Sequence, residues 1–379
     1  MMASPGLVHD YLLVMRGAER TFAAIADCWP QAPIFTLLYD AAGTERTFES
    51  RRVVTSYLQR LGVRQPGFRR LLPFFPRAVE HLPVTDFDLV VSSSSAFAHG
   101  VRPKPGATHV SYCHTPFRYS WHEFDQTTAG APRVLRPAFR RTLARLRRWD
   151  LEASRRVTHY ITNSELSRKR IQDYYGRDAT IVHPPVDVGR FSLAEPEDFF
   201  LVVCELVAHK RVHNALEAAR RVRHPIKVVG GGPQFDQLRR EYASSAQFLG
   251  RVSDDELAGL YRRAKALVVP NIEEFGIAAV ETQASGRPVL AADGGGARET
   301  VVSGETGVLV PPDDVQALAE AMNETAWESF KPDLILRHAQ GFSTAEFKRR
   351  FQAEVSRLSG EERRSALGLS GTDPERGRP

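Results

Sequence analysis

Short apolar runs alternate with segments of helical periodicity along the whole chain. Residues 89–92, 199–204 and 266–269 read as buried strands, and residues 18–28 show the spacing of an amphipathic helix. Strands that alternate with helices in this way are typical of parallel sheets built from βαβ units. We therefore predict the α/β class.

The pattern restarts once, near residue 199, which predicts two such sheets. In the first half the predicted strands are residues 6–9, 34–38, 89–92, 108–113, 159–162 and 180–182, and the predicted helices are residues 18–28, 136–154 and 165–175. In the second half the predicted strands are residues 199–204, 226–229, 246–249, 266–269, 288–291 and 307–310. Residues 184–198 lack periodicity and contain prolines and charges, so they are predicted to be a linker.

Composition places the chain among ordinary globular proteins. Its 379 residues, 42% hydrophobic and 25% charged, suffice for two cores. No run approaches the ~18 apolar residues of a membrane span, and the start of the chain lacks the pattern of a signal peptide. Cys28, Cys113 and Cys204 match no disulfide or metal spacing. We therefore expect a cytoplasmic protein.

The net charge of +6 favours an anionic partner, either a membrane surface or a phosphorylated small molecule, with nucleic acid the weakest choice. Residues 68–77, from Phe68 to Arg77, interleave arginines with bulky apolar residues, which predicts docking on anionic lipid. Residues 133–156 are also arginine-rich and predict a surface helix with a solvated basic side. Its apolar positions, expected in the core, are Leu135, Phe139, Leu143 and Leu146.

Two carboxylates in the segment NIEEFGIAAVETQASG carry the strongest functional signal. Glu273 follows the predicted strand at residues 266–269, and Glu281 lies eight residues further on, within the helix that follows. Open α/β sheets bind ligands at the carboxyl ends of their strands, where helix N-termini favour anions. We therefore predict a ligand site at this edge.

Other candidates also lie where strands end. The glycine-rich turns GGGP (residues 230–233) and GGARET (residues 295–300) allow close backbone approach, and they match neither a P-loop nor a dinucleotide fingerprint. Lys210 and Arg211 form a basic turn suited to a diphosphate. His114 follows the predicted strand at residues 108–113, and Gly17 lies in the first strand-to-helix turn.

As a set, these features resemble the retaining GT-B glycosyltransferases of family 4 over nearly the whole chain. The segments EEFGIAAVE, GGGP, GRVSDDEL, GGARET and GETGVLVPPDD stand in the family's order, and SYCHTPFRYSW, ITNSELSRKRI and IVHPPVDVGRF resemble the mannosyltransferase-type branch of O-antigen and exopolysaccharide biosynthesis.

The resemblance implies two Rossmann-like domains facing each other across a cleft. Residues 1–185 would form an acceptor-binding domain and residues 186–343 a domain that binds the nucleotide sugar. Residues 344–358 would form a terminal helix that packs back toward the N-terminal domain, with residues 359–379 as a disordered tail. The implied reaction is transfer of a sugar, mannose from GDP-mannose, to a lipid-linked or glycan acceptor, without a metal or cofactor.

The resemblance also implies residue roles. Glu281 would bind the ribose, Lys210 would neutralise the diphosphate and His114 would contact the donor sugar. Glu273 would bind sugar hydroxyls. The remaining implied donor-binding positions are Arg211, Phe275, Gly276, Ile277, Gly231, Val252 and Gly17.

Two positions depart from the family's pattern. Glu205 stands where members often have an arginine, and Arg16 replaces a glycine of the first glycine-rich loop. These departures leave open a sugar-nucleotide epimerase or phosphorylase of the same fold, or a non-catalytic nucleotide-sugar binder. Product analysis with donor alone separates the first pair from a transferase, and binding without turnover indicates the last.

Overall fold

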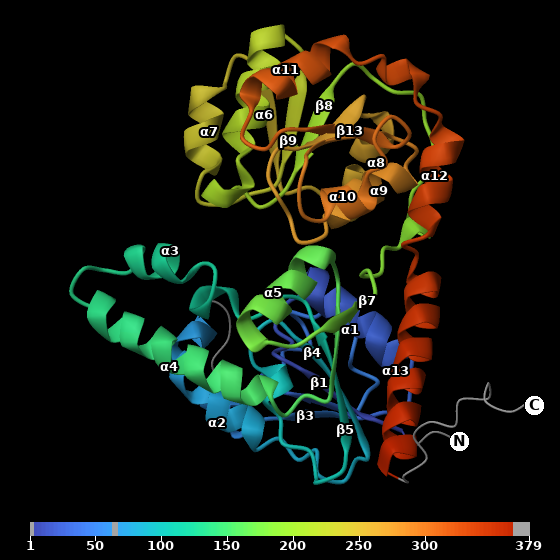
Figure 1. Ribbon diagram of the computed structural model, residues 1–379. Helices are drawn as coiled ribbons and strands as arrows, with labels where there is room; N and C mark the ends of the chain where they lie inside the picture. The colour runs from blue at the N-terminus through green and yellow to red at the C-terminus, as the bar shows by residue number, and fades with distance from the viewer. Residues whose placement is uncertain (1–3, 63–66, 367–379) are drawn as a thin grey trace, which may run out of the picture. The chain divides into compact units, whose positions relative to one another are not determined.

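The chain forms two α/β units in the computed structural model, which describes residues 4–62 and 67–366, with side chains through residue 360 (Figure 1). The first unit comprises Met1–Asn163, Ser167–Val182 and Lys348–Pro379, and the second comprises Ser164–Leu166 and His183–Phe347. The α/β class with two parallel sheets is confirmed. The C-terminal segment from Lys348 therefore belongs to the first unit.

The first unit contains a parallel sheet with the strand order β3-β2-β1-β4-β5-β6-β7 in the described residues. Its strands are β1 (Gly6–His9), β2 (Ile34–Thr36), β3 (Val53–Thr55), β4 (Leu89–Ser94), β5 (Thr108–Cys113), β6 (His159–Thr162) and β7 (Ala179–Ile181). Strand β3 was not predicted, because three half-exposed residues at the sheet's edge leave no run of buried positions. The order is that of a doubly wound fold, whose ligands bind beyond the carboxyl ends of the strands.

Helices cover both faces of this sheet. They are α1 (Gly17–Asp27), α2 (Phe75–Glu80), α3 (Phe124–Ala129), α4 (Arg136–Ser154), α5 (Glu165–Tyr175) and the C-terminal α13 (Thr344–Ala366). Buried residues of α2 and α4 share a core cluster with Val8 and Val90. On the opposite face, Phe22 of α1 stacks on His9 and Phe351 of α13 meets Tyr112 edge-on.

The terminal helix α13 packs on the first unit, as predicted. Lys348 pairs with Asp27 at 2.8 Å, Glu354 accepts a hydrogen bond from Thr180, and Phe351 is fully buried. The helix is longer than predicted, because it continues past residue 358 to Ala366. Residues 367–379 of the predicted tail lie outside the described part of the chain.

Two predictions about apolar surface in the first unit are wrong in part. Within residues 68–77, Phe68, Leu71 and Phe75 are buried in the core, and Phe74 is the large apolar side chain left 57% exposed. Conversely, Leu135 does not join the core with Leu143 and Leu146 but is 60% exposed. Leu135 is the N-cap of α4 and lies before the first helical turn, whereas Leu143 and Leu146 lie within the helix on its buried side.

The second unit contains a parallel sheet with the strand order β10-β9-β8-β11-β12-β13 in the described residues. The strands are β8 (Phe200–Val203), β9 (Ile226–Val229), β10 (Ala246–Gly250), β11 (Ala266–Val269), β12 (Val289–Ala292) and β13 (Gly307–Val310). The helices are α6 (Val212–Val222), α7 (Phe235–Glu241), α8 (Asp254–Arg263), α9 (Ile277–Ala284), α10 (Ala297–Thr300), α11 (Val315–Glu324) and α12 (Pro332–Gln340).

Alternate residues of these strands build two cores. Phe200 and Val202 of β8 face a cluster made with α6, α7 and α11, whereas Leu201 faces a cluster made with α8, α9 and α10. Figure 1 shows these helices on the two sides of the sheet. The layering follows from strands that are apolar on both faces.

The predicted linker at residues 184–198 is part of the second unit rather than a free connection. Val186 and Val188 are buried beside Phe275 and Val280 of the α9 region. The amide of Val186 also donates a hydrogen bond to the carbonyl of Phe342 at 2.9 Å. The sequence pattern did not predict this packing, because the segment contains prolines and charges and lacks periodicity.

Two expectations from composition concern membranes and cysteines. Across the described residues, no helix is both long enough and apolar enough to cross a bilayer. Cys28, Cys113 and Cys204 are all unpaired, and Cys113 is buried in strand β5.

We expect Phe351→Ala to lower the free energy of unfolding by about 3–5 kcal/mol, because it removes a fully buried ring and leaves a cavity. The ring contacts Trp29 and Tyr112 at centroid distances of 6.1 and 5.9 Å. Urea denaturation followed by tryptophan fluorescence measures the change. Gln352→Ala, at an exposed neighbouring position, removes one hydrogen bond to the Cys28 carbonyl and should cost no more than about 1 kcal/mol. Equal costs would contradict the anchoring role of Phe351.

Candidate functional site

The loop between β11 and α9 places both predicted carboxylates in the second unit. Glu273 lies on the loop, and Glu281 lies within α9, as the sequence predicts. Gly276 is the N-cap of this helix and has a φ of 91°, a conformation that favours glycine. The first turn of α9 carries no acidic residue, so the helix N-terminus remains electropositive.

Close backbone packing holds the Glu273 loop in place. The amide of Gly296 donates to the carbonyl of Glu273 at 2.9 Å, and Gly295 forms a β-bridge with Glu273. A Cβ atom at Gly295 would lie 2.2 Å from the Glu273 carbonyl oxygen, and one at Gly296 would lie 2.2 Å from the Phe275 carbonyl oxygen. The turn GGARET therefore needs its glycines to support the loop that carries Glu273.

Lys210 and Glu273 form a half-buried ion pair. Lys210 Nζ lies 2.5 Å from Glu273 Oε1, and the two side chains are 22% and 19% exposed. Burial opposes the charge of Lys210, but the Glu273 carboxylate outweighs it and raises the pKa of the lysine. Lys210 ends the 3-10 turn after β8, so two neighbouring strands bring the pair together.

Glu281 is held by a residue that the sequence reading missed. The hydroxyl of Tyr261 donates to Glu281 Oε2 at 2.9 Å, from a fully buried ring on α8. Burial raises the pKa of Tyr261, and the Glu281 carboxylate adds to the rise. The contact orients one oxygen of Glu281. Nothing in the spacing of Tyr261 and Glu281 distinguishes it from ordinary helix packing.

The GGGP turn lies against the same strand end as Lys210. Gly230 and Gly232 have φ values of 129° and 155°. A Cβ at Gly230 would lie 1.9 Å from the Cys204 carbonyl oxygen. Gly231 accepts a hydrogen bond from the amide of Leu206 at 2.9 Å. The turn is therefore fitted to the backbone that leads to Lys210.

The remaining predicted residues of this unit differ in exposure. Arg211 pairs with Asp313 at 3.4 Å, with both side chains about half exposed. Glu205 is exposed, and its carbonyl accepts a hydrogen bond from Val207.

Several predicted donor-binding side chains pack in apolar clusters instead of facing solvent. Phe275 stacks on His183 and is 4% exposed. Ile277 and Val252 are partly buried against neighbouring clusters. The implied role of Phe275 and Ile277 concerns their backbone amides, which this packing holds in position.

In the first unit, His114 belongs to a chain of three side chains. Its Nε2 lies 2.9 Å from Ser93 Oγ, which lies 3.2 Å from His9 Nδ1. Burial lowers the pKa of His114 to about 4 and that of His9 to about 3, so both rings are neutral at pH 7. A serine hydroxyl has one proton, so it donates to one ring and accepts from the other. The chain therefore couples the tautomer of His114 to that of His9.

Parallel register explains this grouping. His9 pairs with Ser93 across β1 and β4, and Ser93 pairs with Tyr112 across β4 and β5. These residues share one face, and His114 lies two residues beyond Tyr112 on that face. The sequence reading found His114 alone. A polar residue at the end of each adjacent strand is the sequence feature that would have predicted this grouping.

Polar groups also surround the start of α1, where Gly17 is the first residue. The buried Asp10 carboxylate accepts hydrogen bonds from the amides of Ser95, Phe97 and Ala98, at 2.7, 2.8 and 2.6 Å. The amide of Arg16 donates to Glu19, whose pKa burial raises to about 7. Asp10 was not predicted, although it directly follows a strand.

The structure thus divides the predicted residues between the two units. The second unit brings together Lys210 and Glu273. Gly276, the N-cap of α9, lies next to Glu273, and Glu281 lies within α9. The first unit holds His114 and Gly17. In the described part of the chain, no group of three or more His, Cys, Asp or Glu side chains could hold a metal ion.

Comparison with known families assigns both halves of the chain. Residues 15–190 match the model described as Glycosyltransferase Family 4, and residues 188–329 match that of Glycosyl transferases group 1. The chain is a glycosyltransferase that carries these two family domains. The resemblance stated from the sequence is thereby confirmed.

Relatives of this glycosyltransferase have various names. It is 35% identical over 152 residues to O-antigen chain mannosyltransferase C of Escherichia coli, which covers 38% of this chain and 41% of the relative. It is 34% identical over 182 residues to glycogen synthase of Mycobacterium tuberculosis, which covers 43% of this chain and 44% of the relative. The matched segments therefore span less than half the length of these relatives.

Among solved structures, the glycosyltransferase is similar to Anabaena HepE in complex with UDP-glucose. The TM-score is 0.69 at 19% identity, over 93% of this chain and the whole of the other. At this identity the likeness establishes the GT-B fold.

We expect His109→Gln to weaken the acid sensitivity of the first unit. Burial lowers the pKa of the His109 ring to about 3, so between pH 6.5 and pH 3 the unfolded chain binds a proton that the folded one does not. Stability from this residue is complete above pH 6.5 and is lost as pH falls. The variant should recover about 2 kcal/mol of the change between pH 7 and pH 5.

Urea denaturation at the two pH values measures this difference, with tryptophan fluorescence as the signal, since three of the four tryptophans lie in the first unit. His213→Gln, at an exposed position, is the matched control and should leave the pH dependence unchanged. An unaltered slope in His109→Gln would contradict the burial argument. Glu19 has the opposite effect on stability, because its raised pKa favours the folded state as pH falls. The test therefore compares the pH dependence of the His109→Gln variant with that of the His213→Gln control.

Proposed function

We propose that this protein is a retaining, metal-independent glycosyltransferase that moves mannose from GDP-mannose to a lipid-linked or glycan acceptor in cell-surface polysaccharide synthesis. Its reaction would take place on the cytoplasmic side of the membrane. The observation that carries the proposal is the Lys210–Glu273 pair beside the N-terminus of α9. A cation, a carboxylate and a helix N-terminus at one sheet edge suit a donor with a diphosphate and a sugar.

The ion pair suggests how the donor would bind. Lys210 and Glu273 pair with each other at 2.5 Å. A diphosphate would replace Glu273 as the partner of Lys210, and the released carboxylate would accept hydrogen bonds from sugar hydroxyls. Glu281, oriented by Tyr261, would accept hydrogen bonds from the ribose. Each charged group would therefore exchange one partner for another without being left unpaired in a half-buried site.

The chemistry needs charge stabilisation at the leaving group. The bond between the anomeric carbon and the phosphate oxygen breaks, a bond from that carbon to the acceptor oxygen forms, and the acceptor's proton moves to a phosphate oxygen. Negative charge develops on the diphosphate, where Lys210 and the amides at the start of α9 would stabilise it. Attack from the face that the leaving group departs from would retain the anomeric configuration.

The neutral His114 would contact the donor sugar. Its Nδ1 is the ring nitrogen that Ser93 leaves available, because Nε2 is taken by the serine. Glu205, in place of an arginine, removes one expected phosphate cation, and Arg211 is the neighbouring cation that would compensate. The choice of mannose rests on the name of the Escherichia coli relative and on the sequence motifs.

Lys210→Ala should lower kcat about 100- to 1,000-fold, because a preorganised charge at the leaving group is lost. Glu281→Ala should chiefly raise the KM for the donor, by about 10-fold or more, because its hydrogen bonds to the ribose act equally in ground and transition states. Release of GDP, measured with donor and acceptor both present, checks these values. Lys331→Ala and Glu324→Ala, at exposed positions of the same unit, are matched controls and should retain turnover.

Full turnover in Lys210→Ala would show that the role assigned to this lysine is wrong. GDP release that does not need an acceptor would indicate hydrolysis, and formation of an epimeric nucleotide sugar from donor alone would indicate an epimerase instead of a transferase. Donor binding without product in the wild-type protein would indicate a non-catalytic binder.

A thermal-shift screen against GDP-, UDP- and ADP-sugars should single out GDP-mannose. A ligand that binds only the native state stabilises it by about 2.7 kcal/mol at about 100 times its Kd. The shift should shrink in Glu281→Ala and persist in Glu324→Ala. If UDP-glucose stabilised the protein and GDP-mannose did not, the donor assignment would be wrong while the transferase class would stand.

A further inference from the structure

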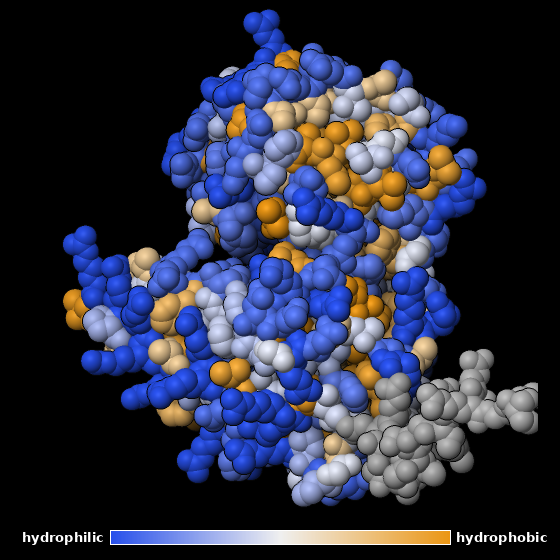
Figure 2. Space-filling model, viewed as in Figure 1, coloured by the Kyte–Doolittle hydropathy of each residue, from blue (hydrophilic) through white to orange (hydrophobic). Residues whose placement is uncertain are grey.

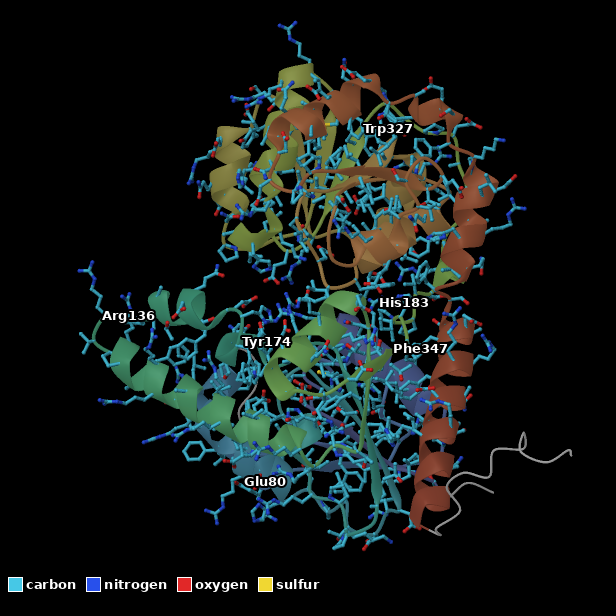
Figure 3. The ribbon with its side chains drawn as sticks, in the orientation of Figure 1. Glu80, Arg136, Tyr174, His183, Trp327 and Phe347 are labelled. Atoms are coloured by element: carbon cyan, nitrogen blue, oxygen red, sulfur yellow. The ribbon has the colours of Figure 1, made fainter. Side chains whose placement is uncertain are left out.

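An apolar tip stands at the N-terminal end of α4 in the first unit. Val134 is 90% exposed, more than any other large hydrophobic residue in the described part of the chain. Leu135 is 60% exposed, as is Leu61. Figure 3 marks Arg136 at this end of the helix, and Figure 2 shows apolar side chains there among strongly hydrophilic ones. Because Val134 and Leu135 are adjacent, they form a small apolar patch bordered by polar residues, an arrangement found at interaction sites.

The helix behind this tip is strongly basic. Residues 130–149 contain seven arginines and no acidic residue. Three of these arginines have structural contacts: Arg136 donates to the carbonyl of Ala129, Arg140 pairs with Asp125, and Arg147 lies over the ring of Phe124. The exposed arginines Arg141, Arg145 and Arg148 have no acidic partner in the part of the chain that the structure describes.

These three arginines share one side of the helix. At 100° per residue they lie opposite the buried positions Leu143 and Leu146. The basic side therefore faces away from the core along the length of α4, and the apolar tip lies at its end. We call Val134, Leu135, Arg141, Arg145 and Arg148 the α4 surface.

The base of α4 is firmly held, so the α4 surface has a rigid support. Asp150 accepts hydrogen bonds from Trp121 at 2.6 Å and from Tyr175 at 2.8 Å. Trp149 donates to Glu80 at 2.9 Å. These contacts fix the C-terminal end of α4 on the first unit.

We propose that the α4 surface docks the protein on an anionic lipid bilayer. Arginines along one side of a helix complement acidic headgroups, and Val134 with Leu135 would enter the boundary between headgroups and acyl chains. An acidic glycan or a nucleic acid would engage the arginines but leave the two aliphatic side chains in water. The combination of charge and apolar tip thus favours lipid over a soluble polyanion.

This surface differs from the one that the sequence predicted. Residues 68–77 use Phe68, Leu71 and Phe75 for the core, which leaves Phe74 as their main apolar contact. The proposal does not depend on which donor or acceptor the protein uses. It does agree with an acceptor that is anchored in a membrane.

Co-sedimentation of the full chain with vesicles tests the proposal. Binding is compared between phosphatidylcholine vesicles and the same vesicles containing phosphatidylglycerol, at low and high salt. We expect binding that requires the anionic lipid and weakens as salt screens the charges. Arg145→Ala/Arg148→Ala should weaken it about 30-fold, and Val134→Asp/Leu135→Asp by at least about 10-fold.

A matched control separates the α4 surface from net charge. Arg239→Ala/Arg240→Ala removes two exposed arginines from α7 and should leave vesicle binding unchanged. Thermal unfolding of every variant confirms that it is folded, which is expected because all these positions are exposed.

Four results would overturn the proposal. One is absence of binding to anionic vesicles by the wild-type protein, and another is an equal loss in the α7 control. The third is loss of binding in Phe74→Asp together with normal binding in both α4 variants, which would assign docking to residues 68–77. If heparin binding depends on Arg145 and Arg148 while Val134→Asp/Leu135→Asp binds vesicles normally, the surface serves a polyanion and the lipid assignment is wrong.

Discussion

The parallel register of the two sheets is the constraint on which both candidate clusters depend. Because parallel strands end at the same edge, residues far apart in sequence meet there without any local signal. In the first sheet this alignment brings His9, Ser93 and His114 within hydrogen-bonding distance. In the second, the alignment of β11 with β12 lays the Glu273 loop against the turn that contains Gly295.

Close backbone contact then determines where the charged side chains of Lys210 and Glu273 lie. The glycines after β12 let the Glu273 loop pack within van der Waals distance, and those after β9 do the same for the backbone before Lys210. Two half-buried charges of opposite sign result, and each offsets the desolvation of the other. A diphosphate sugar carries the same two requirements, an anion and a set of hydroxyls, which is why this pair fits the donor proposed for it.

Arginine serves two purposes on α4, and composition alone does not separate them. Arg140 and Arg147 cover the ring of Phe124 and fasten α3 to α4. Arg145 and Arg148 lie on the side of the helix that faces away from the core. The difference follows from helical phase relative to Leu143 and Leu146, which become buried. Leu135 has the spacing of the core positions but lies before the first turn, so it stays outside.

The sequence by itself determined the α/β class, most strand positions and the placement of Glu273 and Glu281 on a loop and its helix. Those features depend on local periodicity and on glycine positions, which a single chain segment carries. Only the tertiary structure decided that Tyr261 orients Glu281, that Ser93 links His114 to His9, and that Phe68 and Phe75 are buried while Val134 is exposed. These outcomes depend on which strands and helices become neighbours, and hydrophobic pattern does not encode that choice.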